Sequence, residues 1–470
     1  MVNQIEVRNP RTGKYDYAIA PPTSEELTTI SHQLRQQQIQ WFQGGLENRI
    51  QVLQNWQEVI LSYKDEILAA LILDTGRKTE SILEIDGLIS AIDRWCNISP
   101  KLLESEAEKN SSIPFIKIKQ HSKTYPLVGV ISPWNFPLLL STIDTIPALI
   151  SGCSVLVKPS EITPRFIKPL LTTINAIPQL KEVFTYIAGD GKTGANLINQ
   201  VDLICFTGSL VTGKKVGENA AKNFIPAFLE LGGKDPAIVL ETANLDLATS
   251  AILWGSVINA GQSCLSIERV YVAQSIFKPF IEKLVKKAKE LNLAYPTLDD
   301  GKIGPIISTA QAEIIKTHLE DAIAKGAKVC CGGKVEQLGG GYWCHPTVLT
   351  EVNHDMKIMT EETFGPIIPV MTFVNIQEAI QLANDSIYGL SGAVFAGAEN
   401  EALAVANNLE VGAISINDAG LTALIHEGEK NAFKYSGLGG SRMGAAALQR
   451  FRRKQSFMIK TQPIVDPWWF

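Results

Sequence analysis

The chain has few of the features that mark disulfide-bonded, metal-binding or nucleic-acid-binding proteins. Its seven cysteines are scattered and odd in number, and they form neither a Cys-x-x-Cys pair nor a cluster with histidine. That pattern argues for a reducing compartment and against a zinc site. The formal net charge is −5 over 470 residues, which provides no general attraction to nucleic acid. We therefore expect a protein without a bound metal and without a nucleic-acid partner.

Export and membrane insertion are not expected either. The first eight residues lack the basic-then-apolar layout of a signal peptide, so we predict a cytoplasmic protein. The longest apolar stretch, residues 125–150, has the hydropathy of a membrane span, but it contains Asp144 and the prolines Pro126, Pro133, Pro137 and Pro147. It is better interpreted as a strand, a loop around Asn135 and a helix that begins near Pro137.

The composition suits a large globular chain. With 45% hydrophobic and 19% charged residues, the chain is long enough to bury an extensive core and to divide into two or three domains. Residues 24–73 have the periodicity of an amphipathic helix pair, with a cap at Ser24. From about residue 127 to residue 230 strands and helices alternate, which predicts a doubly wound parallel sheet. Residues 111–124 have the pattern of an exposed hairpin.

Three segments each carry a residue suited to covalent catalysis. Asn135 lies in Ser-Pro-Trp-Asn-Phe-Pro, Glu230 lies in Leu-Glu-Leu-Gly-Gly-Lys, and Cys264 ends Asn-Ala-Gly-Gln-Ser-Cys. A helix capped by Asn244 would lead into the last segment, where Gly261 gives the backbone freedom to aim the thiol at a cleft. Taken singly, such residues are more often a buried small hydrophobe, a turn residue or an ion-pair partner. All three in this order favour a catalytic site.

These segments and their order resemble the NAD(P)-dependent aldehyde dehydrogenase superfamily, from about Val7 to about Lys460. The resemblance implies an α/β fold with a Rossmann-type cofactor domain, an α/β catalytic domain and a small β oligomerisation flap. The corresponding ranges are 1–110 and 125–232 for the cofactor-binding domain, 233–434 for the catalytic domain, and 111–124 with 435–470 for the flap and C-terminal tail. In the flap, the predicted hairpin joins a strand at about 455–460, so a homodimer or homotetramer is expected.

The chemistry of this family gives each of the three residues a role. The Cys264 thiolate attacks the aldehyde carbonyl, because a thiolate is the side chain best suited to do so at neutral pH. The Asn135 side-chain amide and the Cys264 backbone N–H stabilise the oxyanion. After hydride leaves to the nicotinamide, Glu230 activates a water that hydrolyses the thioester. The expected product is a carboxylic acid.

Two alternatives stay open. The first is a semialdehyde dehydrogenase, acid-forming or CoA-acylating, although CoA-acylating relatives usually lack the glutamate that Glu230 supplies. The second is a non-catalytic structural or binding protein on the same scaffold. The presence of Cys264, Glu230 and Asn135 together with cofactor residues counts against that second alternative.

The resemblance also assigns residues to the cofactor. Lys158 and Glu161 follow a short apolar strand and would hold the adenosine ribose. Residues 203–213 run from a strand into a helix, the arrangement of an anion site, and resemble the family's phosphate loop although they lack the Gly-x-Gly-x-x-Gly fingerprint. Glu362 would hold the nicotinamide ribose. The full set is Trp134, Lys158, Glu161, Thr207, Gly208, Ser209, Gly232, Glu362 and Phe364, with Phe364 near the ring.

The expected cofactor is NAD, with NADP as the alternative. The Glu161 carboxylate would bond a free ribose hydroxyl and repel a 2′-phosphate, and Lys158 nearby would soften that repulsion.

The substrate tunnel is assigned to Phe136, Leu140, Ile143, Leu265 and Asn417. These residues carry no charge that would anchor a second carboxylate, so we predict an apolar small-molecule aldehyde of medium or long chain. Ile143 stands where the family often has a bulky aromatic, which predicts a wide mouth. Taken singly, each of these residues is as readily explained as a core residue as it is as a tunnel residue. The chain departs from the family pattern at residues 431–433. They are Asn-Ala-Phe, whereas the family normally has Phe-Gly-Gly before the equivalent of Lys434.

The chain ends in Trp468, Trp469 and Phe470, after a basic cluster at residues 450–454. Exposed aromatics forfeit roughly 1.5 to 3 kcal/mol of burial each, so we expect these side chains to be covered. A neighbouring subunit, the mouth of the chain's own tunnel and a membrane surface are the three interpretations. We favour the subunit contact.

Overall fold

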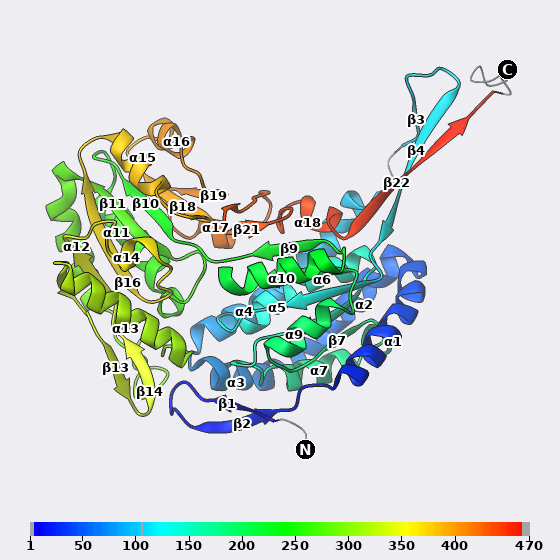
Figure 1. Cartoon of the computed structure of the whole chain (residues 1–470), viewed down its shortest axis with the longest axis horizontal. Helices are drawn as coiled ribbons and strands as arrows, with labels where there is room; N and C mark the ends of the chain where they lie inside the picture. The colour runs from blue at the N-terminus through cyan, green and yellow to red at the C-terminus, as the bar shows by residue number, and fades with distance from the viewer. Residues whose placement is uncertain (1–3, 105–106, 463–470) are drawn as a thin grey trace.

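Two mainly parallel sheets flanked by helices organise the chain in the computed structural model, which describes residues 4–104 and 107–462 (Figure 1). The first sheet consists, in spatial order, of β21 (Gly437–Leu438), β9 (Ala227–Glu230), β8 (Leu203–Thr207), β5 (Leu127–Ile131), β6 (Ser154–Lys158) and β7 (Phe184–Tyr186). The second consists of β12 (Lys328–Cys331), β15 (Thr347–Thr350), β16 (Ile367–Phe373), β11 (Ile267–Ala273), β10 (Asp235–Val239), β18 (Ser391–Phe395) and β19 (Ala413–Ile416). Among these described strands, the edge strands β21 and β12 run antiparallel to their neighbours. The α/β architecture is therefore the one predicted.

The central strands of the first sheet are buried on both faces. Every residue of β5, β6 and β8 is buried, and most are Val, Ile, Leu or Phe. Near-continuous apolar strands of this kind are typical of parallel sheets with helices on both sides. The helices of this part of the chain are α5 (Pro137–Thr142), α6 (Thr145–Ser151), α7 (Ile167–Asn175), α8 (Pro178–Lys181), α9 (Gly191–Ile198) and α10 (Leu210–Lys222).

The second sheet has its own helices and its own apolar core. These helices are α11 (Leu245–Val257), α12 (Phe277–Lys289), α13 (Thr309–Ala324), α14 (Lys357–Thr360), α15 (Ile376–Asn384), α16 (Glu399–Ala406) and α17 (Leu421–Leu424), with 3-10 turns η1 (Ile258–Gly261) and η2 (Gln274–Ile276). The predicted cap of α11 is confirmed, because the Asn244 side chain accepts hydrogen bonds from the N–H groups of Asp246 and Leu247. α18 (Ala446–Gln449) lies near the C-terminus and packs on α6.

Three helices, and not the predicted pair, occupy residues 24–75. They are α1 (Ser24–Gln43), α2 (Gly45–Ser62) and α3 (Lys64–Thr75), and α4 (Thr79–Leu102) follows. The first cap is Thr23, not Ser24. The Thr23 Oγ1 accepts from the Glu26 N–H at 3.2 Å, and the Glu26 carboxylate accepts from the Thr23 N–H at 2.7 Å, so that both ends of a capping box are present. Gly44 lies between the first two helices, and Gly45, the first residue of α2, has φ of +83°.

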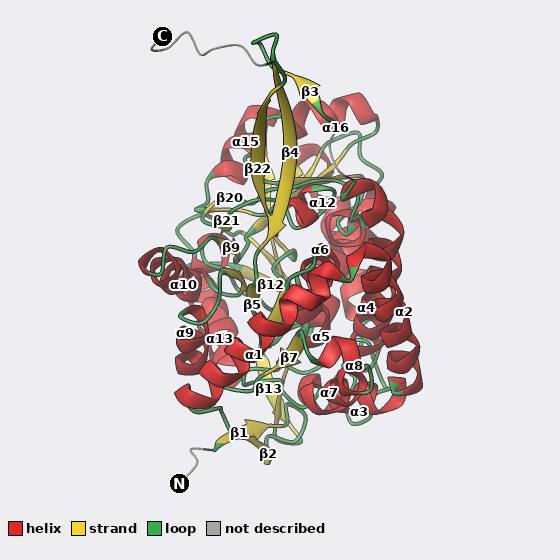
Figure 2. Ribbon diagram, turned by 90° about the vertical axis from the view of Figure 1, so that its right-hand side faces the viewer, coloured by secondary structure: helices red, strands yellow, loops and turns green. Residues whose placement is uncertain are grey.

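A three-stranded arm, in the order β22-β4-β3, projects from the rest of the molecule (Figures 1 and 2). In the arm, β4 (Ile116–Thr124) pairs antiparallel with β22 (Arg452–Lys460) over nine residue pairs. The predicted hairpin at 111–124 is displaced, because its first strand, β3 (Lys109–Asn110), precedes residue 111 and is only two residues long. The predicted C-terminal strand begins at Arg452, three residues earlier than expected, because its pairing with β4 extends to Thr124.

Residues 125–150 form β5, a loop and then α5, which begins at Pro137 as predicted. No helix within the described residues is long and apolar enough to cross a membrane. Three further hairpins or strand pairs complete the fold: β1 (Ile5–Arg8) with β2 (Tyr15–Ile19), β13 (Val335–Leu338) with β14 (Gly341–Cys344), and β17 (Tyr388–Gly389) with β20 (Phe433–Lys434). The aromatic tail at 468–470 lies outside the described residues.

Candidate active site

A cavity of about 100 Å³ lies at the carboxyl ends of β5, β8 and β9, next to the loop that carries Cys264. This edge is where ligands bind in open α/β sheets. The cavity is lined by Pro133, Trp134, Asn135, Leu140, Thr207, Gly208, Ser209, Leu231, Gly232, Cys264, Gln311, Glu362 and Phe364. It therefore brings together the predicted nucleophile, the predicted oxyanion donor and most of the predicted cofactor residues, from segments far apart in the sequence.

The Cys264 loop has an unusual backbone. Asn259 and Ala260 both have φ of 53°, and Gly261 has φ of 72°. A Cβ on Gly261 would lie 2.1 Å from the Gly365 carbonyl oxygen, so only glycine fits there. Left-handed backbone at non-glycine residues is uncommon and clusters at functional sites. The end of α11 is thus turned sharply before the chain reaches the thiol.

The Cys264 thiol is protonated at rest. Burial raises the pKa of Cys264 to about 12, and the nearby Glu362 carboxyl adds to that shift. The Arg442 guanidinium opposes it, while Asp235 and Glu230 have smaller effects in the raising direction. A thiol in this state is a weak nucleophile, so binding of ligands or transfer of the proton must precede attack.

The Asn135 side chain is buried and held in place. Its Nδ2 donates to the Gln262 carbonyl at 2.9 Å, which ties the oxyanion candidate directly to the Cys264 loop. The Asn135 carbonyl accepts from Arg77 at 2.7 Å and from the Asn259 amide at 2.9 Å. Both the amide and the backbone of Asn135 are therefore fixed before any substrate binds.

A buried ion pair supports the same loop. Arg77 donates to the Glu84 carboxylate at 2.8 Å, and both side chains are almost completely buried. The other Glu84 oxygen accepts from the N–H groups of Leu138 and Leu139, at the start of α5. The Arg77 guanidinium also stacks on the Phe136 ring, 4.5 Å from its centroid. This clamp was not predicted, and the spacing of Arg77 and Glu84 across the start of α4 was the signal for it in the sequence.

Glu230 lies beside the cavity, not in its lining. It is the last residue of β9, its side chain is 20% exposed, and its Oε1 lies 3.6 Å from the Arg442 Nε. Arg442 was not predicted as a site residue, and no local pattern marks it. Lys430 was missed as well: burial lowers the pKa of Lys430, whereas Glu230 and Cys264 raise it, which places its ammonium near both groups.

The predicted ribose residues lie at the end of the neighbouring strand. The Lys158 ammonium is buried and donates to the Gly189 carbonyl at 2.7 Å, and it lies 3.4 Å from the half-exposed Glu161 carboxylate. Ser209 caps α10, since its Oγ accepts from the Thr212 N–H at 3.3 Å. The Thr207 hydroxyl accepts from Arg442 at 2.6 Å.

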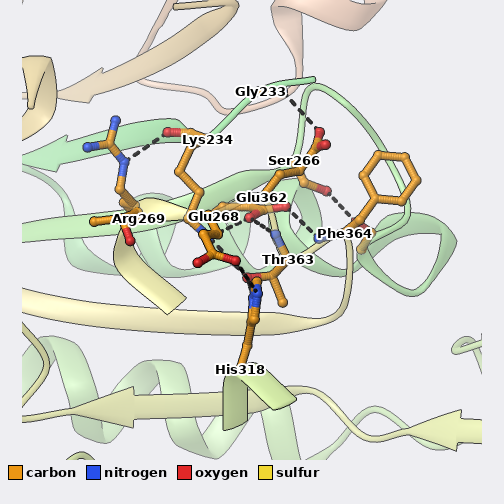
Figure 3. Close-up of polar contacts among 12 residues, drawn as sticks. Gly233, Lys234, Ser266, Glu268, Arg269, His318, Glu362, Thr363 and Phe364 are labelled. Atoms are coloured by element: carbon orange, nitrogen blue, oxygen red, sulfur yellow. Dashed lines mark hydrogen bonds and ion pairs between the residues drawn. The ribbon is translucent and has the colours of Figure 1, made fainter. Parts of the chain in front are cut away.

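A buried network of hydrogen bonds holds the loop that carries Glu362 and Phe364 (Figure 3). The Lys234 ammonium donates to Glu268 at 2.6 Å, and Glu268 in turn accepts from the N–H groups of Thr363 and Phe364. Glu362 itself accepts from the Gly233 N–H at 3.0 Å. Burial raises the pKa of Glu362 to about 8, with the Glu268 carboxylate as the next cause. Glu362 is therefore largely neutral at pH 7.

A Gly-x-Gly-x-x-Gly pattern was overlooked at Gly189, Gly191 and Gly194, between β7 and α9. The usual interpretation of such a pattern is a phosphate site at the helix N-terminus. Here the Asp190 carboxylate caps that helix and accepts from the Lys192 and Thr193 N–H groups. The Asp190 carboxylate therefore already occupies the anion position at the start of α9, and these two N–H groups are not offered to a ligand.

The predicted tunnel residues are less clearly gathered. Leu140 lines the cavity, whereas Phe136, Ile143, Leu265 and Asn417 do not. Asn417 has φ of 53°, and its Oδ1 accepts from the Ala396 N–H at 2.9 Å, which is a structural contact between β18 and β19. The assignment of these four residues to a tunnel stays a prediction.

The chain matches the model of the aldehyde dehydrogenase family over residues 1–457, and it belongs to that family. Among curated proteins it is 36% identical over 440 residues to 4,4′-diapolycopene aldehyde oxidase of Methylomonas sp, covering 92% of this chain and 81% of the relative. It is 30% identical over 464 residues to a protein of Mycolicibacterium smegmatis assigned as an NADP+-type succinate-semialdehyde dehydrogenase, covering 97% and 89%.

Two solved structures are similar along the whole fold. A protein named PutA from Anabaena variabilis, assigned as an aldehyde dehydrogenase, has 62% identity and a TM-score of 0.98, with both chains covered completely. Betaine aldehyde dehydrogenase from Staphylococcus aureus, solved in complex with NAD+, has 32% identity and a TM-score of 0.92, covering 99% of this chain and 93% of that one. Family membership makes this protein an enzyme that acts on small-molecule aldehydes.

Proposed function

We propose that the protein oxidises aldehydes to carboxylic acids with a nicotinamide cofactor, through a covalent intermediate on Cys264. The observation that carries the proposal is the cavity that Cys264 and Asn135 share with Ser209, Glu362 and neighbouring cofactor candidates. A thiol beside a dinucleotide-binding loop is suited to hydride transfer, because the substrate carbon bonded to the sulfur would be held close to the cofactor.

The residues present fit such a cofactor. Gly208 and Gly232 line the cavity without a side chain, and a Cβ on Gly232 would lie 2.5 Å from the Glu362 carboxylate. When bound, the nicotinamide ring accepts the hydride. NAD+ in a similar structure and NADP+ in the name of a relative support both dinucleotides as candidates.

In the proposed reaction, Cys264 loses its proton to water, and its sulfur bonds to the aldehyde carbon as the carbonyl π bond breaks to leave an oxyanion. The Asn135 amide, together with the Cys264 N–H, donates to the oxyanion. Departure of hydride leaves a thioester, and Glu230 takes a proton from the water that cleaves it. The thiol is then regenerated and the acid is released.

We propose an apolar aldehyde of medium or long chain as the substrate. Leu140 and Leu231 line the cavity, and Leu421, Leu424 and Ile425 are exposed on the segment that follows Asn417. The diapolycopene relative acts, by its name, on an aldehyde of an apolar molecule. A kcat/KM series over alkanals, aromatic aldehydes, betaine aldehyde and succinic semialdehyde tests the proposal. Octanal or decanal should exceed succinic semialdehyde, and the reverse order would refute the apolar assignment.

A semialdehyde is the second candidate, and Lys430 is the observation that favours it. Its partly buried ammonium donates to the Thr422 carbonyl and lies near Glu230 and Cys264, which raise the pKa of Lys430 against the effect of burial. A cation so placed would attract a substrate carboxylate. Replacing Lys430 by Met should therefore raise the KM for succinic semialdehyde much more than the KM for octanal, if this candidate is correct.

We further propose a preference for NAD over NADP. The Glu161 carboxylate is close to Lys158 and partly open to solvent, where it would meet the adenosine ribose. A 2′-phosphate would be repelled by the like charge. The expected result is a larger kcat/KM with NAD, and a larger value with NADP would contradict the role of Glu161. A cytoplasmic, oligomeric enzyme is part of the same proposal, and the seven unpaired thiols suit a reducing compartment.

A further inference from the structure

Two arginines from the C-terminal segment share one buried aspartate beneath the active site. Asp144, between α5 and α6, contacts Arg442 at 3.2 Å and also pairs with Arg450. All three side chains are at most 7% exposed. The Arg442 terminal nitrogen that reaches Asp144 also donates to the Thr207 hydroxyl at 2.6 Å. This cluster joins the end of the chain to the strands that carry the site.

The cluster carries an excess positive charge. Two guanidinium groups face one carboxylate, and buried charges are stable only when they are paired. The Nε of Arg442 is buried and donates to no acceptor in the described part of the chain. The Glu230 carboxylate lies beside that nitrogen, with its Oε1 at 3.6 Å. Glu230 therefore supplies the second negative charge.

We infer that Arg442 is a positioning residue for Glu230: it holds the general base in a resting place beside the cavity. This inference rests on the proposed function, in which Glu230 activates water. At 3.6 Å the contact is a charge attraction without a hydrogen bond, so it draws the Glu230 carboxylate toward Arg442 and leaves the side chain free to turn toward the thioester.

Arg442 is held in place by residues other than Glu230. Asp144 and Thr207 hold the terminal nitrogen, so the guanidinium stays in place when Glu230 leaves. Burial lowers the pKa of Arg442, but Asp144 and then Glu230 more than offset this, and the pKa lies above its ordinary value. Arg442 therefore stays charged throughout turnover.

Other charged groups near Glu230 come from separate elements. Lys430, from the segment after α17, attracts the carboxylate as Arg442 does. The thiols of Cys264 and Cys205 would repel it only when ionised, and burial raises the pKa of both thiols far above neutrality. At neutral pH, Arg442 and Lys430 are thus the charges that act on Glu230 from these elements.

The test measures the deacylation step alone. The protein is mixed with NAD and octanal, and the acyl adduct on Cys264 is followed by intact-protein mass spectrometry after a jump to a series of pH values. In the parent protein the decay should accelerate as pH rises and then level off. In Arg442→Gln the pH at which the decay rate is half-maximal should move up by about one pH unit or more. The reason is that a neighbouring opposite charge favours the ionised form of an acid by that amount. Arg442→Lys should keep it near the parent value.

Arg450→Gln is the matched control. It removes the same charge from the same aspartate, but Arg450 stacks on Phe228 and Phe451 and has no contact with Glu230. The pH at which its decay rate is half-maximal should move by much less than in Arg442→Gln. An unchanged point in Arg442→Gln, or equal shifts in both Gln variants, would overturn the inference.

Asp144→Asn provides a test of opposite sign if Arg442→Gln does not fold. With Asp144 neutral, Arg442 acts on Glu230 alone, and the half-maximal point should move to lower pH; an unchanged point would overturn the inference. If the parent protein forms NADH without any adduct on Cys264, the proposed function itself fails, which is distinct from a pH profile that does not move.

Discussion

Cys264 and Glu230 are expected to act in different halves of the reaction. Cys264→Ala should lower turnover by about 1000-fold or more, because no covalent intermediate forms. Glu230→Gln should still release NADH in a burst of about one equivalent per site and then stall at the thioester. Rapid-mixing absorbance measures both. Full steady turnover in Glu230→Gln, or a burst-free loss equal to that of Cys264→Ala, would contradict the division of roles.

Glu362 is expected to make NAD binding depend on pH. Its pKa is raised to about 8, so the free protein holds the proton at pH 7, whereas a bond to ribose hydroxyls as acceptor favours the carboxylate. Binding should then release a proton, and the Kd for NAD should fall by up to about tenfold per pH unit up to about pH 8 and level off above it. Titration calorimetry in buffers of different ionisation enthalpy measures the proton directly. Glu362→Gln should remove the dependence, and an equally steep dependence in that variant would refute the assignment.

At the scale of elements, the Arg77–Glu84 pair is expected to fasten α4 to the Asn135 loop and α5. Glu84→Gln leaves Arg77 buried without its partner, which should cost about 3 to 5 kcal/mol of unfolding free energy and lower kcat through a displaced Asn135. Asp86→Asn, two residues along the same helix, breaks the exposed Lys64–Asp86 pair and should cost about 1 kcal/mol or less. Denaturant unfolding and steady-state rates measure both, and equal losses would count against the clamp.

At the scale of the whole molecule, the arm is expected to build the oligomer. β22 is an edge strand in the described part of the chain and exposes Phe457, Met458 and Ile459, which is an arrangement that invites pairing with another copy. Met458→Glu should shift the protein to smaller species in sedimentation velocity. Val374→Glu is the control, since Val374 is also 75% exposed but lies away from the arm. An unshifted Met458→Glu would refute the role of β22.

The aromatic tail belongs to the same question. It follows β22, and its three interpretations stay predictions because residues 463–470 lie outside the described residues. Deletion of 466–470 should also favour smaller species if the tail packs on a neighbouring subunit. An altered KM for long aldehydes with unchanged assembly would select the tunnel mouth, and loss of vesicle co-flotation alone would select a membrane surface.

Local patterns in the sequence were enough to predict the architecture, and they carry the hypothesis about the reacting groups. The alternation of apolar runs with helical periodicity predicted parallel sheets, and Asn135, Cys264 and the cofactor loops were each recognisable within about six residues. Such motifs are readable because the required backbone turn and the chemistry lie in one short segment. The boundaries were less accurate: Thr23 caps α1 because its side chain reaches the Glu26 N–H, and both Thr23 and Ser24 have a hydroxyl that suits that role.

The charges that act on those reacting groups came only from the tertiary structure. Asp144 and Arg442 are 298 residues apart, and Lys158 meets the Gly189 carbonyl 31 residues away. Nothing within either segment distinguishes such a residue from an ordinary surface charge, because its partner is chosen by how the sheets and the returning C-terminal chain pack. The sequence by itself therefore determined which groups we propose to react, whereas the packing of distant segments decided which charges surround Glu230 and Cys264.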